Sequence, residues 1–417
     1  MSPDADVLII GGGLAGLCCA LRLHQSGLSF QILEGSDGVG GRVRTDKVEG
    51  FLLDRGFQVL LTAYPEARRI LDYDALNLRP FYPGALIRYK GRFYRFADPW
   101  RHPIDGLLGL FTPIGSFSDK LRVRRLRGRV LTGSLSDLYN HPETTTLQAL
   151  RKIGFSEGMI DRFFKPFIGG VFFDSNLGVS SRMFEFGFRM FSMGDTALPS
   201  GGMGAIPEQI AARLPAGTVR TEARVESIQE GGVTLQSGEK VKAHAVVVAT
   251  EGPETARLLG NQERPGSRSV TCVYFVADEP PISAPLLVLN GEGKGPINSL
   301  CCPSNVASNC APQGRSLISV TIIGNPDQDD QQLEPAVRGQ LTEWFGPRAE
   351  GWRYLRTYRI SHALPMQIPP VSDPTLRPAQ VRPGLFVCGE YQNVASIQWA
   401  MVSGRLAAEA VMDWLRK

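Results

Sequence analysis

The sequence of 417 residues contains no apolar run that approaches the ~18 consecutive residues a membrane-spanning helix needs. Its formal net charge is only +4, which is too small to predict a nucleic-acid partner. The first apolar strand leads at once into glycines, so no secretory signal is visible. We therefore expect a cytoplasmic protein, with attachment to the surface of a membrane left open.

Cysteine is also scarce, and its spacing does not indicate disulfide bonds or a metal site. The seven cysteines are odd in number and form no CxxC or CxxxC pair. This argues against a disulfide framework or a zinc site, predicts no metal, and favours a reducing compartment. Two pairs of cysteines are vicinal. Burial as small residues is the expected role, and redox activity is the alternative.

What the sequence does contain, near its start, is a strand, a glycine turn, a helix and a second strand. Residues 7–10 are a short continuous apolar run, as in a strand that is buried on both faces of a parallel sheet. Residues 14–24 have helical apolar spacing, and residues 30–33 are again strand-like. The order predicts a βαβ unit.

Three glycines occupy the turn of this unit with the spacing G-x-G-x-x-G. Gly11 allows a tight turn, Gly13 lets a pyrophosphate approach the backbone, and Gly16 lets the helix pack on the strand. The helix N-terminus then offers free N–H groups and a positive dipole. Glu34 ends the second strand, where a carboxylate accepts hydrogen bonds from ribose hydroxyls. A glycine turn without a ligand is the alternative.

A second cluster follows closely and indicates a bulkier ligand. Gly40 and Gly41 let the backbone pass near it, and Arg42 is placed to pair with a pyrophosphate. A nicotinamide-only domain has no need of this element. Gly56 and Phe57 bring another glycine and an aromatic ring towards the same face, although an ordinary polar loop is the alternative there.

A third cluster lies near the C-terminus. A strand within residues 383–388 ends in Gly389 and Glu390. Ser396 and Ile397 then open an alanine-rich helix, expected to run to about residue 415. If the N-terminus of this helix points at a ligand, its dipole favours negative charge there.

Together the three clusters resemble the flavin amine oxidase superfamily, which includes amine oxidases, protoporphyrinogen oxidases and phytoene-desaturase-like carotenoid enzymes. The resemblance covers residues 5–60, about 200–250 and 383–410. It implies FAD as the cofactor and an α/β fold, in which a Rossmann-type FAD-binding domain is interleaved with an α+β substrate domain. The cofactor-binding residues that it implies, with their close neighbours, are Gly11, Gly13, Leu14, Ala15, Gly16, Glu34, Gly35, Gly40, Gly41, Arg42, Gly56, Phe57, Val225, Gly389, Glu390, Ser396, Ile397 and Met401.

Stretches that are typical of a nucleotide-binding domain alternate along the chain with stretches of a different type, which suggests two interleaved domains. We expect the FAD-binding domain to consist of residues 1–60, 200–262 and 372–417. The substrate domain is expected to consist of residues 61–199 and 263–371.

The middle of the chain is rich in aromatic residues. Residues 86–89 and 93–96 read as a hairpin, and Ser156 is placed to cap a helix that continues through Phe167. Residues 183–191 form a second aromatic helix. Residues 163–172 resemble a segment of the desaturase-like and protoporphyrinogen-oxidase-like branches. An aromatic wall suits a flat or elongated apolar substrate, and ordinary core packing is the alternative.

Two residues bear on the chemistry. The amine-oxidase branch places a lysine near flavin N5, but Lys294 is the only lysine between residues 263 and 371 and reads as part of a turn. This speaks against simple amine oxidation. His362 is the one candidate proton handler, with a structural role as the alternative. No other catalytic residue is assigned, because the flavin itself carries the redox chemistry.

These observations predict an FAD-dependent oxidoreductase that takes a hydride from a small apolar substrate of the isoprenoid, carotenoid or tetrapyrrole type. A flavin amine oxidase is the second hypothesis. A flavin-dependent isomerase or a non-redox FAD-binding protein is the third. No second G-x-G-x-x-G follows a strand, so a separate nicotinamide domain is not expected. The electron acceptor and the oligomeric state stay open.

One stretch suggests contact with a membrane surface. Residues 120–129 contain six basic residues and no acidic one, and residues 107–111 just before them are mainly apolar. Together, residues 107–129 could lie on an anionic bilayer. A solvated basic helix face is the plainer alternative.

Overall fold

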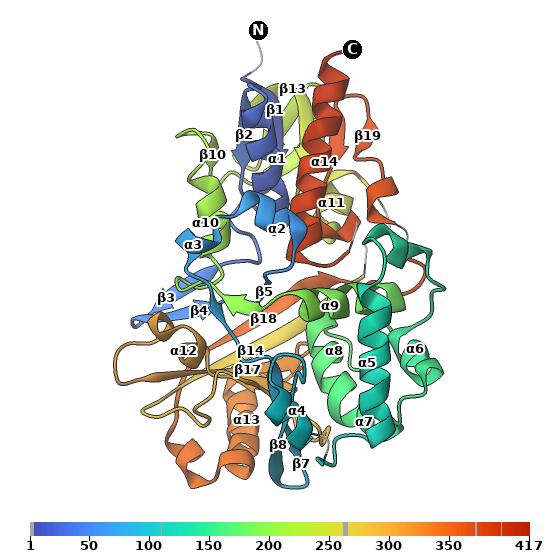
Figure 1. Cartoon of the computed structure of the whole chain (residues 1–417). Helices are drawn as coiled ribbons and strands as arrows, with labels where there is room; N and C mark the ends of the chain where they lie inside the picture. Colours follow the sequence, from blue (N-terminus) through green and yellow to red (C-terminus); the bar gives the residue numbers. More distant parts are fainter. Residues whose placement is uncertain (1–3, 110, 262–265, 372, 393) are drawn as a thin grey trace.

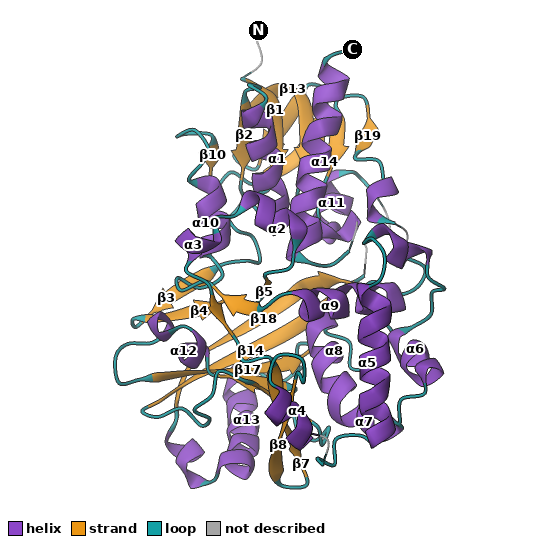
Figure 2. Cartoon of the chain, viewed as in Figure 1, coloured by secondary structure: helices purple, strands orange, loops and turns teal. Residues whose placement is uncertain are grey.

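The protein is described by a computed structural model that covers residues 4–109, 111–261, 266–371, 373–392 and 394–417. The domain limits expected at residues 262 and 372, and Leu110 of the apolar stretch, lie outside these residues. One sheet lies near both chain termini, a second lies in the opposite half, and a group of helices stands beside the second (Figures 1 and 2). No helix within the described ranges is long and apolar enough to cross a bilayer.

The first sheet is built around four parallel strands in the order β2-β1-β13-β20. Their bounds are β1 (Ala5–Ile10), β2 (Phe30–Leu33), β13 (Lys240–Val248) and β20 (Leu385–Val387). The register pairs Ile10 with Leu33 and Val248, and Val248 with Val387, so the four strands end at a common edge. Ligands of open α/β sheets bind beyond this carboxyl edge.

The remaining strands of this sheet lie within residues 200–262 and 372–417, two of the three segments that the sequence groups together. They are β10 (Val219–Arg220), β11 (Val225–Gln229), β12 (Gly232–Leu235) and β19 (Gln380–Arg382). β11 and β12 form an antiparallel hairpin around Gly231. The helix α11 (Gly252–Leu258) follows β13, and α10 (Ala205–Ala211) carries Pro207 near its start.

Two helices cross closely beside this sheet (Figure 1). They are α1 (Leu14–Gln25) and α14 (Ile397–Leu415), and α14 has the bounds that the sequence predicts. A Cβ on Gly16 would lie 2.0 Å from the carbonyl oxygen of Gly11, and one on Gly404 would lie 2.0 Å from that of Ala15. Glycine is therefore required where α1 packs on the first turn and where α14 packs on α1.

The second sheet has seven strands in the order β18-β14-β17-β16-β15-β7-β8. Their bounds are β7 (Gly84–Tyr89), β8 (Arg92–Ala97), β14 (Ser267–Ala277), β15 (Leu287–Asn290), β16 (Ser299–Cys301), β17 (Ser316–Ile323) and β18 (Arg353–Pro365). The predicted hairpin is β7–β8. The helix α13 (Asp330–Phe345) packs its buried face against the sheet.

A group of helices completes this half of the molecule. It comprises α4 (Pro103–Gly109), α5 (Phe117–Leu131), α6 (Thr146–Ile153), α7 (Glu157–Met159), α8 (Lys165–Phe172) and α9 (Ser181–Met193). Ser156 caps α7 as expected, since its Oγ accepts from the N–H of Met159 at 3.2 Å. The expected helix is interrupted by a π-helical turn at Ile160–Phe164. Asp119 of α5 accepts from the N–H and Oγ of Ser156 at 2.8 and 2.6 Å, which fixes α5 against α7.

Small elements join the two halves. They are β3 (Thr45–Val48), β4 (Phe51–Asp54), β5 (Leu60–Leu61), β6 (Arg79–Pro80), β9 (Thr196–Leu198), α2 (Pro65–Ile70), α3 (Tyr73–Leu76) and α12 (Pro303–Val306). Phe51 and Leu53 pack against Cys272 and Tyr274 of β14, so the β3–β4 hairpin is anchored on the second sheet.

All seven cysteines are buried and free, as the sequence suggests. Burial raises the pKa of each of these thiols, to about 12 for Cys388 and about 11 for Cys272. A thiol in this state is a weak nucleophile. The cysteines therefore act as small core residues.

Candidate functional site

A large cavity lies between the first sheet, the second sheet and the helical group, and its volume is about 1190 Å³. It begins beside Gly11 and Glu34 at the carboxyl edge of the first sheet and passes Ser396. It then continues past α8 and α9 and reaches the surface at a mouth beside α4 and α5, where the lining side chains of Leu107, Phe117 and Leu121 are exposed. A pocket for one drug-sized ligand is about 300–1,000 Å³, so this cavity has room for a long cofactor and a substrate together.

The glycine loops meet at the start of the cavity. Gly11 has a φ of +107°, and a Cβ there would lie 2.8 Å from the carbonyl oxygen of Ala249. The N–H of Gly40 donates to the carbonyl of Gly12 at 2.8 Å. A Cβ on Gly13 would meet no atom within 4 Å, and Gly13 lines the cavity. Bare backbone is therefore presented to the space where a ligand would lie.

Glu34 is fixed in the wall of this part of the cavity. Its Oε2 accepts from the N–H of Gly12 at 2.7 Å, and its Oε1 accepts from the N–H and Oγ of Ser36 at 2.8 and 2.7 Å. Within the described residues, Oε2 accepts only the hydrogen bond from Gly12 and so keeps a lone pair for a further donor, such as a ribose hydroxyl. Arg224 and Val225 line the same end.

Arg42 brings positive charge to the other side of the loops. Its guanidinium pairs with the carboxylate of Glu390 and also donates to the carbonyl of Ala363 at 2.8 Å. Burial raises the pKa of Glu390, and the charge of Arg42 opposes that rise. Both residues line the cavity, so a cation stands beside the glycine backbone where an anionic group would be bound.

Two helix N-termini point into the same region. α1 begins after Gly13, has no side-chain cap and has no acidic residue in its first turn. α14 begins after Ser396, whose Oγ accepts from the N–H of Trp399 at 3.2 Å, and it also lacks an early acidic residue. Ile397 and Ala400 line the cavity. The positive ends of both helix dipoles therefore favour negative charge in a ligand.

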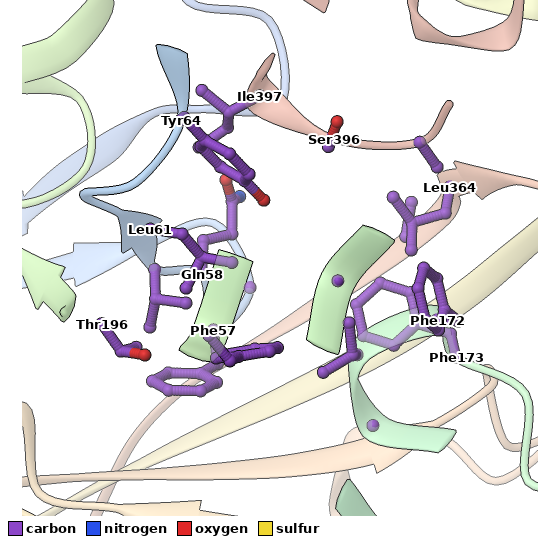
Figure 3. A pocket seen from close by; sticks show the side chains of 18 of the residues that line it. Phe57, Gln58, Leu61, Tyr64, Phe172, Phe173, Thr196, Leu364, Ser396 and Ile397 are labelled. Carbon is purple, nitrogen blue, oxygen red and sulfur yellow. The ribbon is translucent and has the colours of Figure 1, made fainter. Parts of the chain in front are cut away.

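Beyond Ser396 the cavity widens into a chamber with mainly apolar walls (Figure 3). The amide of Gln58 donates to the carbonyl of Arg42 at 2.8 Å, and the ring of Tyr64 stacks on Phe186 with centroids 6.2 Å apart. The apolar and aromatic residues of the chamber wall are Phe57, Leu61, Tyr64, Phe81, Phe96, Phe163, Phe167, Phe172, Phe173, Phe186, Phe188, Phe191 and Leu364.

The cofactor-binding residues predicted from the sequence line this cavity, with the exception of Gly16 and Met401. Gly16 lies under the turn, where it permits close packing, and Met401 is fully buried in α14. The side chain of His362 is exposed outside the cavity lining, although its neighbours Ala363 and Leu364 belong to that lining. Lys294 is exposed in a turn, as expected, and does not line the cavity.

Several lining residues were not anticipated from the sequence. Thr250 and Glu251 follow the buried strand β13 and so reach the carboxyl edge. The end of an apolar strand is a signal that would have found them. Gln58 and Tyr64 come from connections between small elements, and Thr196 begins the short strand β9, whose courses no local pattern reveals.

The donor set fits an FAD molecule. Open backbone at Gly13, a fixed carboxylate at Glu34 and a cation at Arg42 suit an ADP moiety, and the chamber beyond Ser396 continues directly from them. The chain matches the flavin containing amine oxidoreductase family over residues 14–412. The chain belongs to this family. It is an FAD-dependent oxidoreductase.

Relatives extend along most of its length. A coproporphyrinogen III oxidase of Propionibacterium freudenreichii subsp. freudenreichii is 23% identical over 502 aligned positions, covering 99% of this chain and 92% of that protein. The flavin-containing amine oxidase B of Sus scrofa is 49% identical over 115 positions, covering 25% of this chain and 21% of that protein. The solved structure of an oxidoreductase from Methanosarcina mazei has a TM-score of 0.72 at 18% identity, covering 98% of this chain and 99% of that one.

Proposed function

We propose that this enzyme removes a hydride from an apolar substrate of the isoprenoid, carotenoid or tetrapyrrole type, held in the aromatic chamber. The observation that carries the proposal is the continuity of the cavity from the nucleotide-binding edge to that chamber. When bound, FAD accepts the hydride. A relative that aligns over nearly all of the chain is a coproporphyrinogen III oxidase, which supports the tetrapyrrole type.

The walls explain why an apolar substrate is favoured. Phe163 stacks on Phe167 with centroids 5.3 Å apart, and Phe167 lies 5.2 Å from the ring of Phe191. These rings offer flat faces to a planar or conjugated molecule. Polar groups of the chamber wall, such as Gln58 and Thr196, are few. The described chamber residues include no carboxylate, lysine or histidine, so they position the substrate and exclude water but hold no strong acid or base.

We assign the ADP moiety of FAD to the glycine loops and their neighbours. Glu34 would accept from the ribose, Arg42 would face the pyrophosphate, and the backbone of Val225 would lie beside adenine. The remaining proposed cofactor contacts are Gly11, Gly13, Leu14, Ala15, Gly35, Gly40, Gly41, Gly56, Phe57, Gly389, Glu390, Ser396 and Ile397, with Gly16 and Met401 supporting them from behind.

The chemistry can be tested by anaerobic titration of the oxidised holoenzyme. A tetrapyrrole such as coproporphyrinogen III, a polyene such as phytoene and an amine such as benzylamine are added separately, and the flavin absorbance is followed. Bleaching by either of the first two supports the proposal. Bleaching by the amine alone would make the enzyme an amine oxidase. If a bound substrate never bleaches the flavin, an isomerase or a non-redox role follows.

We also propose that the protein contacts a membrane surface through residues 107–129 and the adjoining residues 100–106. Eight of the thirteen exposed large apolar side chains in the described part of the chain lie between residues 100 and 131. They are Trp100, Ile104, Leu107, Leu108, Phe111, Phe117, Leu121 and Leu131. Exposed apolar patches of this kind mark interaction sites, and a lipid surface suits an enzyme whose substrate dissolves in lipid.

The basic residues contribute less to this contact than the sequence suggests. Arg129 forms an ion pair with buried Glu185 at 2.7 Å, and Arg122 lies 3.5 Å from buried Asp119. Arg125 makes no hydrogen bond or ion pair within the described residues. We therefore expect membrane binding to depend mainly on the apolar side chains and only partly on salt.

Co-sedimentation with liposomes tests this contact. Leu108→Ser and Phe111→Ser should release the protein from anionic vesicles, because these side chains are 62% and 83% exposed and do not line the cavity. Leu376→Ser is the matched control, since Leu376 is 78% exposed elsewhere. Negligible binding of the unmodified protein at low salt, or equal loss in all three variants, would contradict the proposal.

A further inference from the structure

The basic residues of α5 fall into two sets. Lys120, Arg124 and Arg127 line the cavity mouth. The other three do not line it, and two of those are paired with the buried carboxylates of Asp119 and Glu185. The positive charge that remains available on this helix is therefore concentrated where the cavity opens.

Arg127 has an unused donor at this position. Its guanidinium lies over the ring of Trp100, 4.2 Å from the ring centroid, and one terminal N–H donates to the carbonyl of Ser192 at 3.2 Å. Its Nε–H is buried and has no acceptor within the described residues. This nitrogen is closed to solvent even in the open cavity, so a ligand would reach the guanidinium through the Nη1 amino group, which has no hydrogen-bond partner within the described residues.

The neighbouring groups do not neutralise this charge. Arg124 is exposed and makes no hydrogen bond or ion pair within the described residues. Lys120 donates to the carbonyl of Thr112 at 3.4 Å, and burial lowers its pKa while the charge of Asp119 opposes this, so Arg124 and Arg127 carry most of the charge at the mouth. The carboxylate of Asp98 lies at the same end of the lining, but it is 3.6 Å from the guanidinium of Arg101 and accepts from the backbone of residue 100. The mouth therefore keeps an excess of positive charge.

We propose that Lys120, Arg124 and Arg127 bind an acidic group of the substrate. The substrate is then an amphiphile, with its apolar body in the aromatic chamber and at least one carboxylate at the mouth. This inference rests on the proposed function and narrows its substrate class, because a neutral polyene has no group that uses these cations. Carboxylate and guanidinium form charge-assisted, frequently bidentate hydrogen bonds, which also fix the end of the substrate that enters first.

Binding of a matched pair of probes tests the inference on the FAD-loaded protein. Coproporphyrin III carries four carboxylates, and its tetramethyl ester carries none on the same ring. Porphyrin fluorescence in one detergent gives both affinities. The acid should bind at least about tenfold more tightly, equivalent to ~1.4 kcal/mol. Arg124→Ala and Arg127→Met should remove most of that preference and leave the ester unaffected, whereas Arg124→Lys should retain it.

Arg125→Ala is the control, because Arg125 lies on the same helix but not in the cavity lining. Equal affinity for acid and ester, or an equal effect of Arg125→Ala and Arg124→Ala, overturns the inference. Binding of the same variants to vesicles of anionic phospholipid is measured as well. If Arg124→Ala weakens vesicle binding and leaves the acid preference intact, the cations serve lipid headgroups and the inference fails. If neither porphyrin binds while a neutral polyene still bleaches the flavin, the inference fails and the proposed function stands.

Discussion

The guanidinium of Arg42 pairs with the carboxylate of Glu390, which follows it in the chain by 348 residues. The same guanidinium donates to the carbonyl of Ala363 at 2.8 Å, at the end of β18. One side chain therefore links the glycine loops and the strand β20 of the first sheet to the second sheet. It does so on the wall of the cavity, where the proposed pyrophosphate would lie.

Replacing Arg42 by Met should weaken both folding and FAD retention. Glu390 is 8% exposed, and without Arg42 it would be a buried carboxylate with no cation. Breaking a fully buried pair costs about 3–5 kcal/mol, and the cost here should be smaller because the side chain of Arg42 is 34% exposed. The double variant Arg42→Met/Glu390→Gln should recover most of the unfolding free energy but little of the FAD affinity. Urea unfolding and the flavin absorbance of the purified protein measure the two effects. An Arg42→Met variant as stable as the parent would contradict this account.

The parts of this site that could be predicted are those encoded by neighbouring residues. Gly11, Gly13 and Glu34 belong to one strand–turn–helix–strand unit, so residue type and spacing were enough to place them at the carboxyl edge. The pair formed by Arg42 and Glu390 could not be predicted as a pair, because no local pattern states which distant loops meet.

The same limit applies to the basic helix. In sequence, residues 120–129 contain no acidic residue. In the structure, Glu185 of α9 reaches Arg129, and Asp119 lies beside Arg122. Tertiary contacts therefore divide a uniform run of charge into paired residues and residues that line the cavity mouth. The π-helical turn at Ile160–Phe164 was likewise not expected, since local spacing alone predicted a regular helix there.

Gly404→Ala should destabilise the protein through the crossing of two helices. Its new Cβ would lie 2.0 Å from the carbonyl oxygen of Ala15, and that atom is backbone that cannot move independently. Overpacking of this kind typically costs about 1–3 kcal/mol. Gly128→Ala in α5 is the matched control, because a Cβ there meets nothing within 4 Å and alanine favours a helix by about 1 kcal/mol. Thermal unfolding should therefore shift in opposite directions, and parallel shifts would refute the packing argument.

Lys294→Ala should leave flavin reactivity nearly intact. The side chain is exposed and outside the cavity lining, while its carbonyl accepts from the side chains of Asn290 and Gln340 at 2.8 and 2.7 Å. The residue thus serves the turn through its backbone, which alanine preserves. Stopped-flow reoxidation of the reduced holoenzyme by oxygen is the measurement. A collapse of the rate with FAD still bound would place this lysine in the chemistry and favour an amine oxidase.

Asp54 should make stability depend on pH in the opposite direction from an ordinary paired carboxylate. It accepts from Oγ1 of Thr45 at 2.6 Å and from the N–H of Met203 at 2.9 Å, yet burial raises its pKa from 3.8 to about 6. Between about pH 4 and pH 6 the folded chain therefore holds a proton that the unfolded chain has released. Its contribution to stability is lost as the pH rises through this window, by roughly 2–3 kcal/mol. The side chain in Asp54→Asn cannot ionise. The unfolding free energy of the variant minus that of the parent should therefore increase by this amount between pH 4 and pH 7. Comparing the two proteins cancels the titration of every other group, and a difference that stays constant with pH would show that Asp54 titrates normally.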